Sequence, residues 1–565
     1  MRTGRAQGAR RSSRRPRTQG ASWLHSTGQV VVATNPVAVI TPLTAGADAQ
    51  TVMPWIRRSP RLRRMGMTAR VIHGDGPTTV PRPPYARLPV LSAAATLAVV
   101  LLVTANQYGF HRDELYFRML DPAWGYVDQP PLIPLLANAM TELIADEPWA
   151  VRLPAIVAVV AATLVAAAIT RELGGGALAQ GLCAWTFAFA SFPLVAGHVL
   201  VTTSTDLLAW LLASWFACKA LLRGDERWWI AVGAVVGLAT YGRLLIPWWV
   251  LGMVVGFLLV GPRRPLRSRS FWVGGVIAAV VALPNLVYQV VNGFPQLDMG
   301  AALAENNADE VRVMMWPFLF ILLPAVWVVG AVALWRRPAW RPLRAFLVAF
   351  VVVVVLTFVG GAQFYYPVGL LAVLFAAGWV PTAAWLARSS TAVRAGIGAL
   401  LVVYVVVSVV VSLPVIGVGT LGSTPVPGIN QAAADQVGWP AYVRQVAAVW
   451  DGLSEDERKD AVVITSNYGE AGAIDRYGPA LGLPTPYSGQ NALHDQARPP
   501  DSTQTVVFVG GQYGFARTLF EECEVRDRLR NGVDVDNEEE GVPVAVCRGP
   551  LRPWPGLWDD LRHLD

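Results

Sequence analysis

Long apolar runs are the feature that most constrains the fold of this chain, because they recur from about residue 88 to about residue 416. A helix that crosses a bilayer needs about 20 predominantly apolar residues, and these runs reach that length. Hydrophobic residues make up 54% of the 565 residues and charged residues only 15%, whereas a soluble domain carries roughly 25% charged residues. The sequence therefore predicts a mainly α, polytopic helical membrane protein.

The apolar windows predict about eleven transmembrane helices. The windows are 88–106, 151–170, 177–196, 204–222, 228–243, 245–261, 271–291, 313–334, 344–361, 365–386 and 395–416.

Arginine clusters between alternate windows predict the orientation in the membrane. Two clusters are dense, at 262–270 and 335–344. Because Arg and Lys are enriched in cytoplasmic loops, we expect these loops and the N-terminus inside. The 107–150 loop and everything after residue 417 then lie outside the cytoplasm, in a multi-pass protein of the plasma membrane.

Three regions differ in composition. Residues 1–84, rich in Arg, Ser, Thr, Pro and Gly, are predicted to be a disordered, Arg-rich cytoplasmic tail. Translation starting at Met65 or Met67 is an alternative that would remove most of this tail. Residues 85–416 form the transmembrane domain and 417–565 a small extracytoplasmic α/β domain.

The 417–565 region has apolar runs of strand length. AVVIT at 461–465 and TVVFVG at 505–510 alternate with Gly/Pro-rich turns. Residues 440–452 and 514–531 are predicted helices.

The four cysteines fall into two pairs. Cys183 and Cys218 lie within apolar runs and are expected to be packing residues. Cys523 and Cys547 lie in the polar C-terminal region, where an oxidising compartment would let them pair, but the sequence leaves pairing and free thiols equally open.

The segment HRDELYFRMLDPAWGYVDQPPL at 111–132 is too polar to cross a membrane and follows the first apolar window. It carries the acidic pair Asp113 and Glu114, then Asp128 just before two prolines. Carboxylates beside a transmembrane helix are costly unless they have a partner or a function. Such a group can act as a general base on a hydroxyl, because partial burial raises its pKa toward neutrality.

Two other interpretations concern the same loop. Asp113 has an alternative role as a structural ion pair with Arg112 or Arg118. The aromatic residues of the loop favour an interfacial helix that lies on the membrane. These aromatic residues are Tyr116, Phe117, Trp124 and Tyr126.

Further polar residues are expected at the same membrane face. Asp206 follows a Ser/Thr run and is either a helix N-cap or a substrate ligand. Arg243 is suited to a lipid phosphate, with snorkelling to the interface as the alternative. Tyr365 and Tyr366 are either site residues or part of an aromatic belt. His198 is more simply read as a core residue than as a ligand.

At this point the residues resemble a known family. The strings DELYF, AWGYVDQPPL and EPWAVRLPAI resemble the first-loop signature of family 39 glycosyltransferases of the GT-C superfamily, the relatives of protein O-mannosyltransferase and lipid A aminoarabinose transferase. FPLVAGHVLVTTSTDLLAWLL, RWWIAVGAVVGLATYGRLL, ALPNLVYQVVNGFPQL and GGAQFYYPVGLLAVLFAAG extend the resemblance over roughly 85–390.

The resemblance implies an inverting transferase that uses a polyprenyl-phosphate sugar at the outer face. Asp113 matches the catalytic base, and Glu114 matches its neighbour in an orienting or binding role. Asp128 matches an acidic position that in some members contacts a metal or the substrate, so a divalent metal ion is possible there. Arg243 matches a basic position that meets the lipid phosphate. Gln129 departs from the His or Lys common in the family.

The predicted substrate-binding residues are Asp128, Gln129, Asp206, Arg243, Tyr365 and Tyr366. The predicted partners are the membrane, the lipid-linked donor and a protein, lipid or envelope glycan acceptor. Nucleic acid is not among them, because no basic patch is interleaved with aromatic residues. The alternative function is a transporter or a flippase for lipid-linked sugars, which would place ionisable groups near the bilayer midplane.

Overall fold

A computed structural model of the chain describes residues 29–32, 70–73 and 80–564. Residues 1–78 and 79–565 form two separate units. In the first unit, strand β1 (Gln29–Val32) pairs antiparallel with β2 (Arg70–His73). Most of the predicted 1–84 tail, with the alternative start at Met65 or Met67, lies outside the described residues and stays a prediction.

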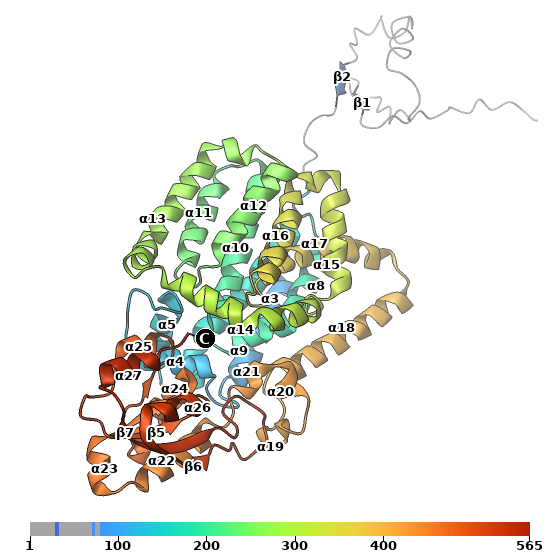
Figure 1. Cartoon of the computed structure of the whole chain (residues 1–565). Coiled ribbons are helices and arrows are strands. Elements are labelled where there is room, and N and C mark those ends of the chain that lie inside the picture. The colour runs from blue at the N-terminus through green and yellow to red at the C-terminus, as the bar shows by residue number, and fades with distance from the viewer. Residues whose placement is uncertain (1–28, 33–69, 74–79, 565) are drawn as a thin grey trace, which may run out of the picture. The chain divides into compact units, whose positions relative to one another are not determined.

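The second unit begins with a large set of apolar helices (Figure 1). They are α3 (Arg87–Thr104), α7 (Leu153–Glu172), α8 (Ala177–Ala188), α9 (Ser191–His198), α10 (Thr202–Arg223), α11 (Trp228–Ala239), α12 (Ile246–Leu259), α13 (Arg269–Val291), α14 (Pro295–Phe318), α15 (Pro324–Arg336), α16 (Arg344–Val359), α17 (Val368–Arg388) and α18 (Thr391–Ser412). Short 3-10 turns η1 (Pro265–Arg267) and η2 (Pro338–Leu343) precede α13 and α16.

The predicted number of spans is corrected downward. In the described part of the chain, seven helices are long and apolar enough to cross a membrane, or eight if α8 and α9, which meet at a 56° bend, form one broken span. Three more predicted windows fall on α11, α12 and α15, which have only 12, 14 and 13 residues. The fold class, a polytopic helical membrane protein, is confirmed.

The window 313–334 is wrong as one continuous span. Its first residues are the end of α14, which begins far upstream at Pro295, and the rest is α15. Pro317 and Pro324 flank the break. Proline lacks the N–H that a continuous helix needs, so the apolar run is divided between two helices.

Glycines let several helices approach at backbone distance. A Cβ at Gly233 of α11 would collide with the backbone of Gly274 on α13, and a Cβ at Gly274 would collide with the backbone of Trp229 on α11. Gly330 of α15 and Gly378 of α17 face the partner backbone in the same way. Small residues at crossings are typical of membrane helices, which associate through close van der Waals packing.

The C-terminal region is a small α/β structure, as predicted. Its helices are α19 (Val418–Leu421), α20 (Val426–Ile429), α21 (Gln431–Ala434), α22 (Trp439–Asp451), α23 (Glu455–Asp460), α24 (Tyr468–Tyr477), α25 (Asn491–Gln496), α26 (Tyr513–Ala516) and α27 (Trp554–Asp560), with turns η3 (Pro479–Leu481) and η4 (Arg517–Leu519). Its strands are β3 (Ala461–Thr465), β4 (Tyr487–Ser488), β5 (Thr505–Val509), β6 (Phe520–Arg528) and β7 (Pro543–Pro550). The sheet order is β4-β3-β5-β7-β6, with β3 parallel to β4 and β5, and β7 antiparallel to β5 and β6.

The strands expected at 461–465 and 505–510 and the helix expected at 440–452 are confirmed. The helix expected over 514–531 is wrong, because most of it is the edge strand β6. Nearly all β6 side chains are exposed, so the segment lacks the apolar alternation that marks a half-buried strand. Cys523 of β6 lies opposite Cys547 of β7, and the two form a disulfide.

The first loop holds α4 (Arg112–Met119), α5 (Leu132–Leu143) and α6 (Pro148–Val151). α4 packs against α24 of the C-terminal region, and the interfacial position expected for this segment stays a prediction. Tyr116 and Phe117 are buried in a core shared with α22, α24 and β5. Residues 79–565 thus form one compact unit, and the division at 416/417 stays a prediction.

Glycine allows α4 and α24 to touch. A Cβ at Gly472 would lie 2.5 Å from the carbonyl oxygen of Leu115, and one at Gly469 would lie 3.0 Å from the Cβ of Arg112. The sequence YGEAG therefore places the start of α24 directly against α4.

We expect Gly472→Ala to loosen this contact, because backbone cannot move aside as a flexible side chain can. Overpacking of this kind costs about 1–3 kcal/mol, and the apparent Tm of the detergent-solubilised protein should fall by several degrees. Gly514→Ala, where an added Cβ meets nothing within 4 Å, should leave Tm unchanged. Equal Tm values for the two variants would contradict the close packing described here.

Candidate functional site

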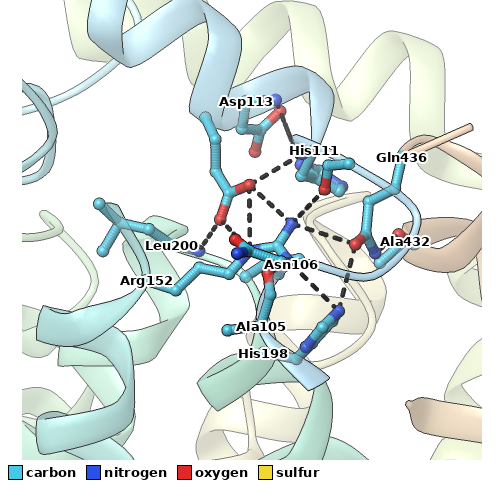
Figure 2. Close-up of polar contacts among 12 residues, drawn as sticks. Ala105, Asn106, His111, Asp113, Arg152, His198, Leu200, Ala432 and Gln436 are labelled. Carbon is cyan, nitrogen blue, oxygen red and sulfur yellow. Dashed lines mark hydrogen bonds and ion pairs between the residues drawn. The ribbon is translucent and has the colours of Figure 1, made fainter. Parts of the chain in front are cut away.

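A network of polar side chains lies where the first loop meets the α9–α10 junction and the segment before α22 (Figure 2). Its centre is the carboxylate of Glu114, which is fully buried. Arg152 donates to it from Nε at 2.9 Å and from Nη2 at 2.9 Å. The backbone N–H groups of His111 and Leu200 donate to it at 2.8 Å each. The pair is therefore a buried, bidentate ion pair with its remaining lone pairs satisfied.

The guanidinium of Arg152 joins three further segments. It donates to the carbonyl oxygens of Ala105 at 2.6 Å and Gly109 at 2.7 Å, and to Oε1 of Gln436 at 3.0 Å (Figure 2). His198 lies 3.3 Å from Arg152 and 3.1 Å from Gln436 through Nε2, and is buried. His198 is thus a core residue, as its simpler interpretation predicted.

The start of α4 explains how Glu114 and Asp113 come to point differently. His111 caps the helix: its Nδ1 accepts from the N–H of Asp113, while Glu114 reaches back to the N–H of His111. This reciprocal capping box fixes the third helical residue toward the cap. Burial lowers the pKa of His111, which favours the neutral imidazole that a cap acceptor requires.

Asp113 has a different environment from Glu114. Its side chain is 28% exposed, and its Oδ1 accepts a hydrogen bond of 3.0 Å from the hydroxyl of Tyr468 at the start of α24. No arginine pairs with it among the described residues. Arg112 pairs with Glu538, and Arg118 pairs with Asp146 and Asp475. The ion-pair alternative for Asp113 is therefore wrong.

Asp128 is bound by Tyr116, which stacks on the tyrosine that contacts Asp113. Its Oδ1 accepts from the hydroxyl of Tyr116 at 3.1 Å, and Nε2 of Gln129 lies 3.3 Å from Oδ2. Tyr116 stacks on Tyr468 with ring centroids 4.6 Å apart. Burial raises the pKa of Asp128 to about 7, and the nearby charge of Asp113 adds to the rise. Each carboxylate is thus held by one tyrosine of a stacked pair.

Arg243 and the tyrosines after α16 form a second polar group. Arg243 donates to Oγ1 of Thr203 at 3.0 Å and to the hydroxyl of Tyr366 at 3.1 Å, and its guanidinium lies over the rings of Tyr366 and Tyr365 at 4.6 and 5.5 Å. Asp206 is close enough to interact with this charge. Arg243 and both tyrosines are packed together, which does not fit free snorkelling or a loose aromatic belt.

Asp206 does not cap its helix. Its Oδ1 accepts from the indole N–H of Trp210, one turn further along α10, at 3.0 Å. Helix α10 begins earlier, at Thr202. The N-cap interpretation is therefore wrong, and Asp206 is a buried carboxylate beside Arg243.

The two groups are joined through the double proline. The N–H of Leu132, which follows Pro131, donates to the carbonyl oxygen of Tyr241 at 2.9 Å. Asp128 and Arg243 therefore lie on two loops that hydrogen-bond to one another. The arrangement brings the carboxylates of Asp113 and Asp128 and the guanidinium of Arg243 to the same region of the molecule.

Three residues of this site were not predicted from the sequence. Arg152 lies in the string EPWAVRLPAI but pairs with a residue 38 positions away. Tyr468 follows Asn467, whose side chain caps α24 in an N-x-x-E pattern with Glu470; that pattern predicts a helix start but no partner. Asp435 is buried 3.7 Å from Nε2 of His111, and burial raises its pKa to about 8.

A metal site is not supported by the donor set. Within residues 80–564, no group of three or more His, Cys, Asp or Glu side chains is arranged to hold a metal ion. The predicted ligand Asp128 is bonded to Tyr116 and Gln129 instead.

Comparisons with known proteins agree with the class of protein that this fold and site define, a multi-pass membrane protein with a polar site at one end of its helices. Residues 128–288 match the family model described as dolichyl-phosphate-mannose-protein mannosyltransferase. The resemblance to this glycosyltransferase family, predicted from the sequence, is confirmed over that range. It includes Asp128, Gln129, Asp206 and Arg243, while Asp113 and Glu114 precede it.

A lipid A galacturonosyltransferase, RgtD of Rhizobium johnstonii, is 28% identical over 202 residues, or 35% of this chain. The alignment spans only 41% of that relative's length. ArnT from Cupriavidus metallidurans, solved in the apo state, is 17% identical with a TM-score of 0.49, covering 81% of this chain and 97% of that one. The same protein bound to undecaprenyl phosphate is 17% identical with a TM-score of 0.47, covering 80% of this chain and 97% of that one.

We expect Glu114→Gln to destabilise the fold strongly, because it leaves the buried guanidinium of Arg152 without its counter-charge. Breaking one half of a buried pair costs about 3–5 kcal/mol. Thermal unfolding and the yield of monodisperse protein measure the effect. Glu142→Gln, an exposed glutamate of the same loop, is the matched control. Wild-type stability for Glu114→Gln would show that the pair does not support the loop.

Buried carboxyls predict a pH dependence of stability. Burial raises the pKa of Asp435 from 3.8 to about 8 and that of Glu539 from 4.5 to about 7. Between pH 4 and 8 the folded state holds protons that the unfolded chain has released, so stability should fall as pH rises through this window. Asp435→Asn should flatten the Tm-versus-pH curve, and Asp451→Asn, at an exposed position, should not. A wild-type Tm that rises from pH 5 to 8 would contradict this.

Proposed function

We propose that this protein transfers a sugar, with inversion, from a polyprenyl-phosphate donor to a hydroxyl acceptor at the outer face of the membrane. The observation that carries the proposal is the environment of Asp113. This carboxylate is partly exposed, is held by a phenol and is free of the arginines beside it. A carboxylate held in this way is available to take a proton.

Asp113 is the general base in this proposal. Its carboxylate removes the proton of the acceptor hydroxyl as the hydroxyl oxygen bonds to the anomeric carbon. The bond between that carbon and the phosphate oxygen breaks, and the polyprenyl phosphate leaves with the electron pair. Attack opposite to the leaving group inverts the configuration. General-base assistance of this kind contributes about 10²–10⁴-fold to the rate.

Arg243 is suited to the leaving phosphate. A guanidinium carries five N–H donors, and here one Nη donates to Thr203 and the other to Tyr366. The tyrosines set the direction of the group, so its charge is oriented before the donor arrives. Preorganised positive charge at the developing phosphate lowers the barrier without reorganisation.

The remaining predicted residues have supporting roles. Glu114 is fully buried and paired, so we assign it the positioning of α4 rather than contact with substrate. Asp128 lies near Asp113 and Gln129 contacts Asp128, and both suit sugar hydroxyls. Asp206, Tyr365 and Tyr366 orient Arg243 and line the phosphate end.

The lipid-linked donor follows from the family match, whose description names a dolichyl-phosphate sugar. The partial relative RgtD acts on a lipid acceptor, and the acceptor class proposed here is a hydroxyl of protein, lipid or envelope glycan. The outward orientation rests on the arginine-rich loops opposite the acidic first loop.

Asp113→Asn tests the proposal. Purified protein in lipid vesicles is incubated with radiolabelled polyprenyl-phosphate mannose, arabinose or uronic acid and an envelope extract, and transferred label is counted. We expect the variant to lose at least 10²-fold of the wild-type rate while keeping its Tm. Asp121→Asn, an exposed aspartate of the same loop, should keep full activity. Transfer by Asp113→Asn at the wild-type rate would remove Asp113 as the base, and lipid movement across the vesicle without any transfer would favour a flippase.

A further inference from the structure

We infer that the C-terminal region completes the active site, and that Tyr468 is a positioning residue for Asp113. The inference deepens the proposed function, because it assigns to residues 417–565 a part in the reaction. The contact joins residues 355 positions apart in the sequence.

The hydroxyl of Tyr468 is the group that holds Asp113. It donates to Oδ1 at 3.0 Å, which leaves Oδ2 to take a proton. Burial raises the pKa of Tyr468 well above its usual value, and the neighbouring charge of Asp113 adds to the rise. The phenol therefore stays protonated and remains a donor over the whole working range of pH.

The ring of Tyr468 contacts two side chains of α4. It stacks on Tyr116 with ring centroids 4.6 Å apart, and the guanidinium of Arg112 lies over the ring, 4.9 Å from its centroid, in a cation–π contact. Such contacts contribute attraction beyond simple burial. These two ring contacts restrict the side chain, and its hydroxyl points to Asp113.

The backbone at this point is fixed as well. The N–H of Tyr468 donates to Oε1 of Gln490 at 2.7 Å. Asn467 caps α24 through its side chain, which accepts from the N–H of Glu470 at 2.8 Å. Gly469 and Gly472 permit backbone-distance contact with α4. The start of α24 is thus built to place a phenol at one position above the first loop.

Other charged groups face Asp113 without replacing this contact. His111 lies 3.9 Å away through Nδ1, and Asp128 and Asp435 are near enough to interact with its charge. Two of these three are acids whose pKa burial raises to about 7 and about 8, so neither supplies a positive charge that would pair with Asp113. A neutral donor such as the phenol holds Asp113 in this setting without consuming its negative charge in an ion pair.

Tyr468→Phe tests the inference, because it keeps the stacked ring and removes only the hydroxyl. We expect kcat to fall about 10- to 100-fold, the loss that follows removal of a hydrogen bond to a charged group, while KM for the polyprenyl-phosphate sugar stays within about twofold. Tm should stay close to that of wild type. Tyr513→Phe, whose hydroxyl contacts a strand carbonyl in the same region, is the matched control and should change neither constant.

A second measurement does not need transfer activity. Carbodiimide-driven coupling of an amine to exposed carboxyls, read by mass spectrometry, should label Asp113 several-fold faster in Tyr468→Phe than in wild type or Tyr513→Phe. Faster labelling supports the positioning role even where no sugar is transferred, which separates this inference from the proposed function. Unchanged labelling of Asp113, or unchanged kcat in an active enzyme, would overturn it.

Discussion

The buried ion pair of Glu114 and Arg152 is the interaction on which the rest of this site depends. Both side chains are wholly shielded from solvent, so each has exchanged hydration for the other and for backbone groups. Through Ala105, Gly109, Leu200 and Gln436 the pair ties the end of α3, the first loop, the α9–α10 junction and the segment before α22 to one point. A buried pair with every lone pair satisfied has essentially one geometry, and the loop inherits that geometry.

The adjacent carboxylates of Asp113 and Glu114 at the start of α4 consequently have different environments. The capping box turns Glu114 inward to Arg152, and the next position back along the helix, about 100° away, directs Asp113 to α24. One acid is paired with a guanidinium and fixed. The other has partial access to solvent and accepts a hydrogen bond from a phenol.

Much of the architecture was predictable from local pattern, and most of the site's contacts were not. Apolar windows located the helices, and strand-length runs located β3 and β5. Both signals depend only on the types of consecutive residues. Strand β6 was not predicted because its charged residues occupy both odd and even positions, so the sequence shows no alternation of polar and apolar residues. The acidic residues of the first loop were identified by type, but their partners Arg152 and Tyr468 lie 38 and 355 positions away. Nothing local to Asp113 encodes a tyrosine in another region.

The C-terminal region packs into the first loop and does not form a separate core. Its core is continuous with that of the first loop, since Leu115 and Tyr116 share one apolar cluster with Trp439, Val463 and Val507. Partly buried ion pairs from Arg118 and Arg476 to Asp146 and Asp475 join the first loop and α24 at the same junction. Since packing and charge both fix α24 against α4, Tyr468 and Asp113 are held in one position relative to each other.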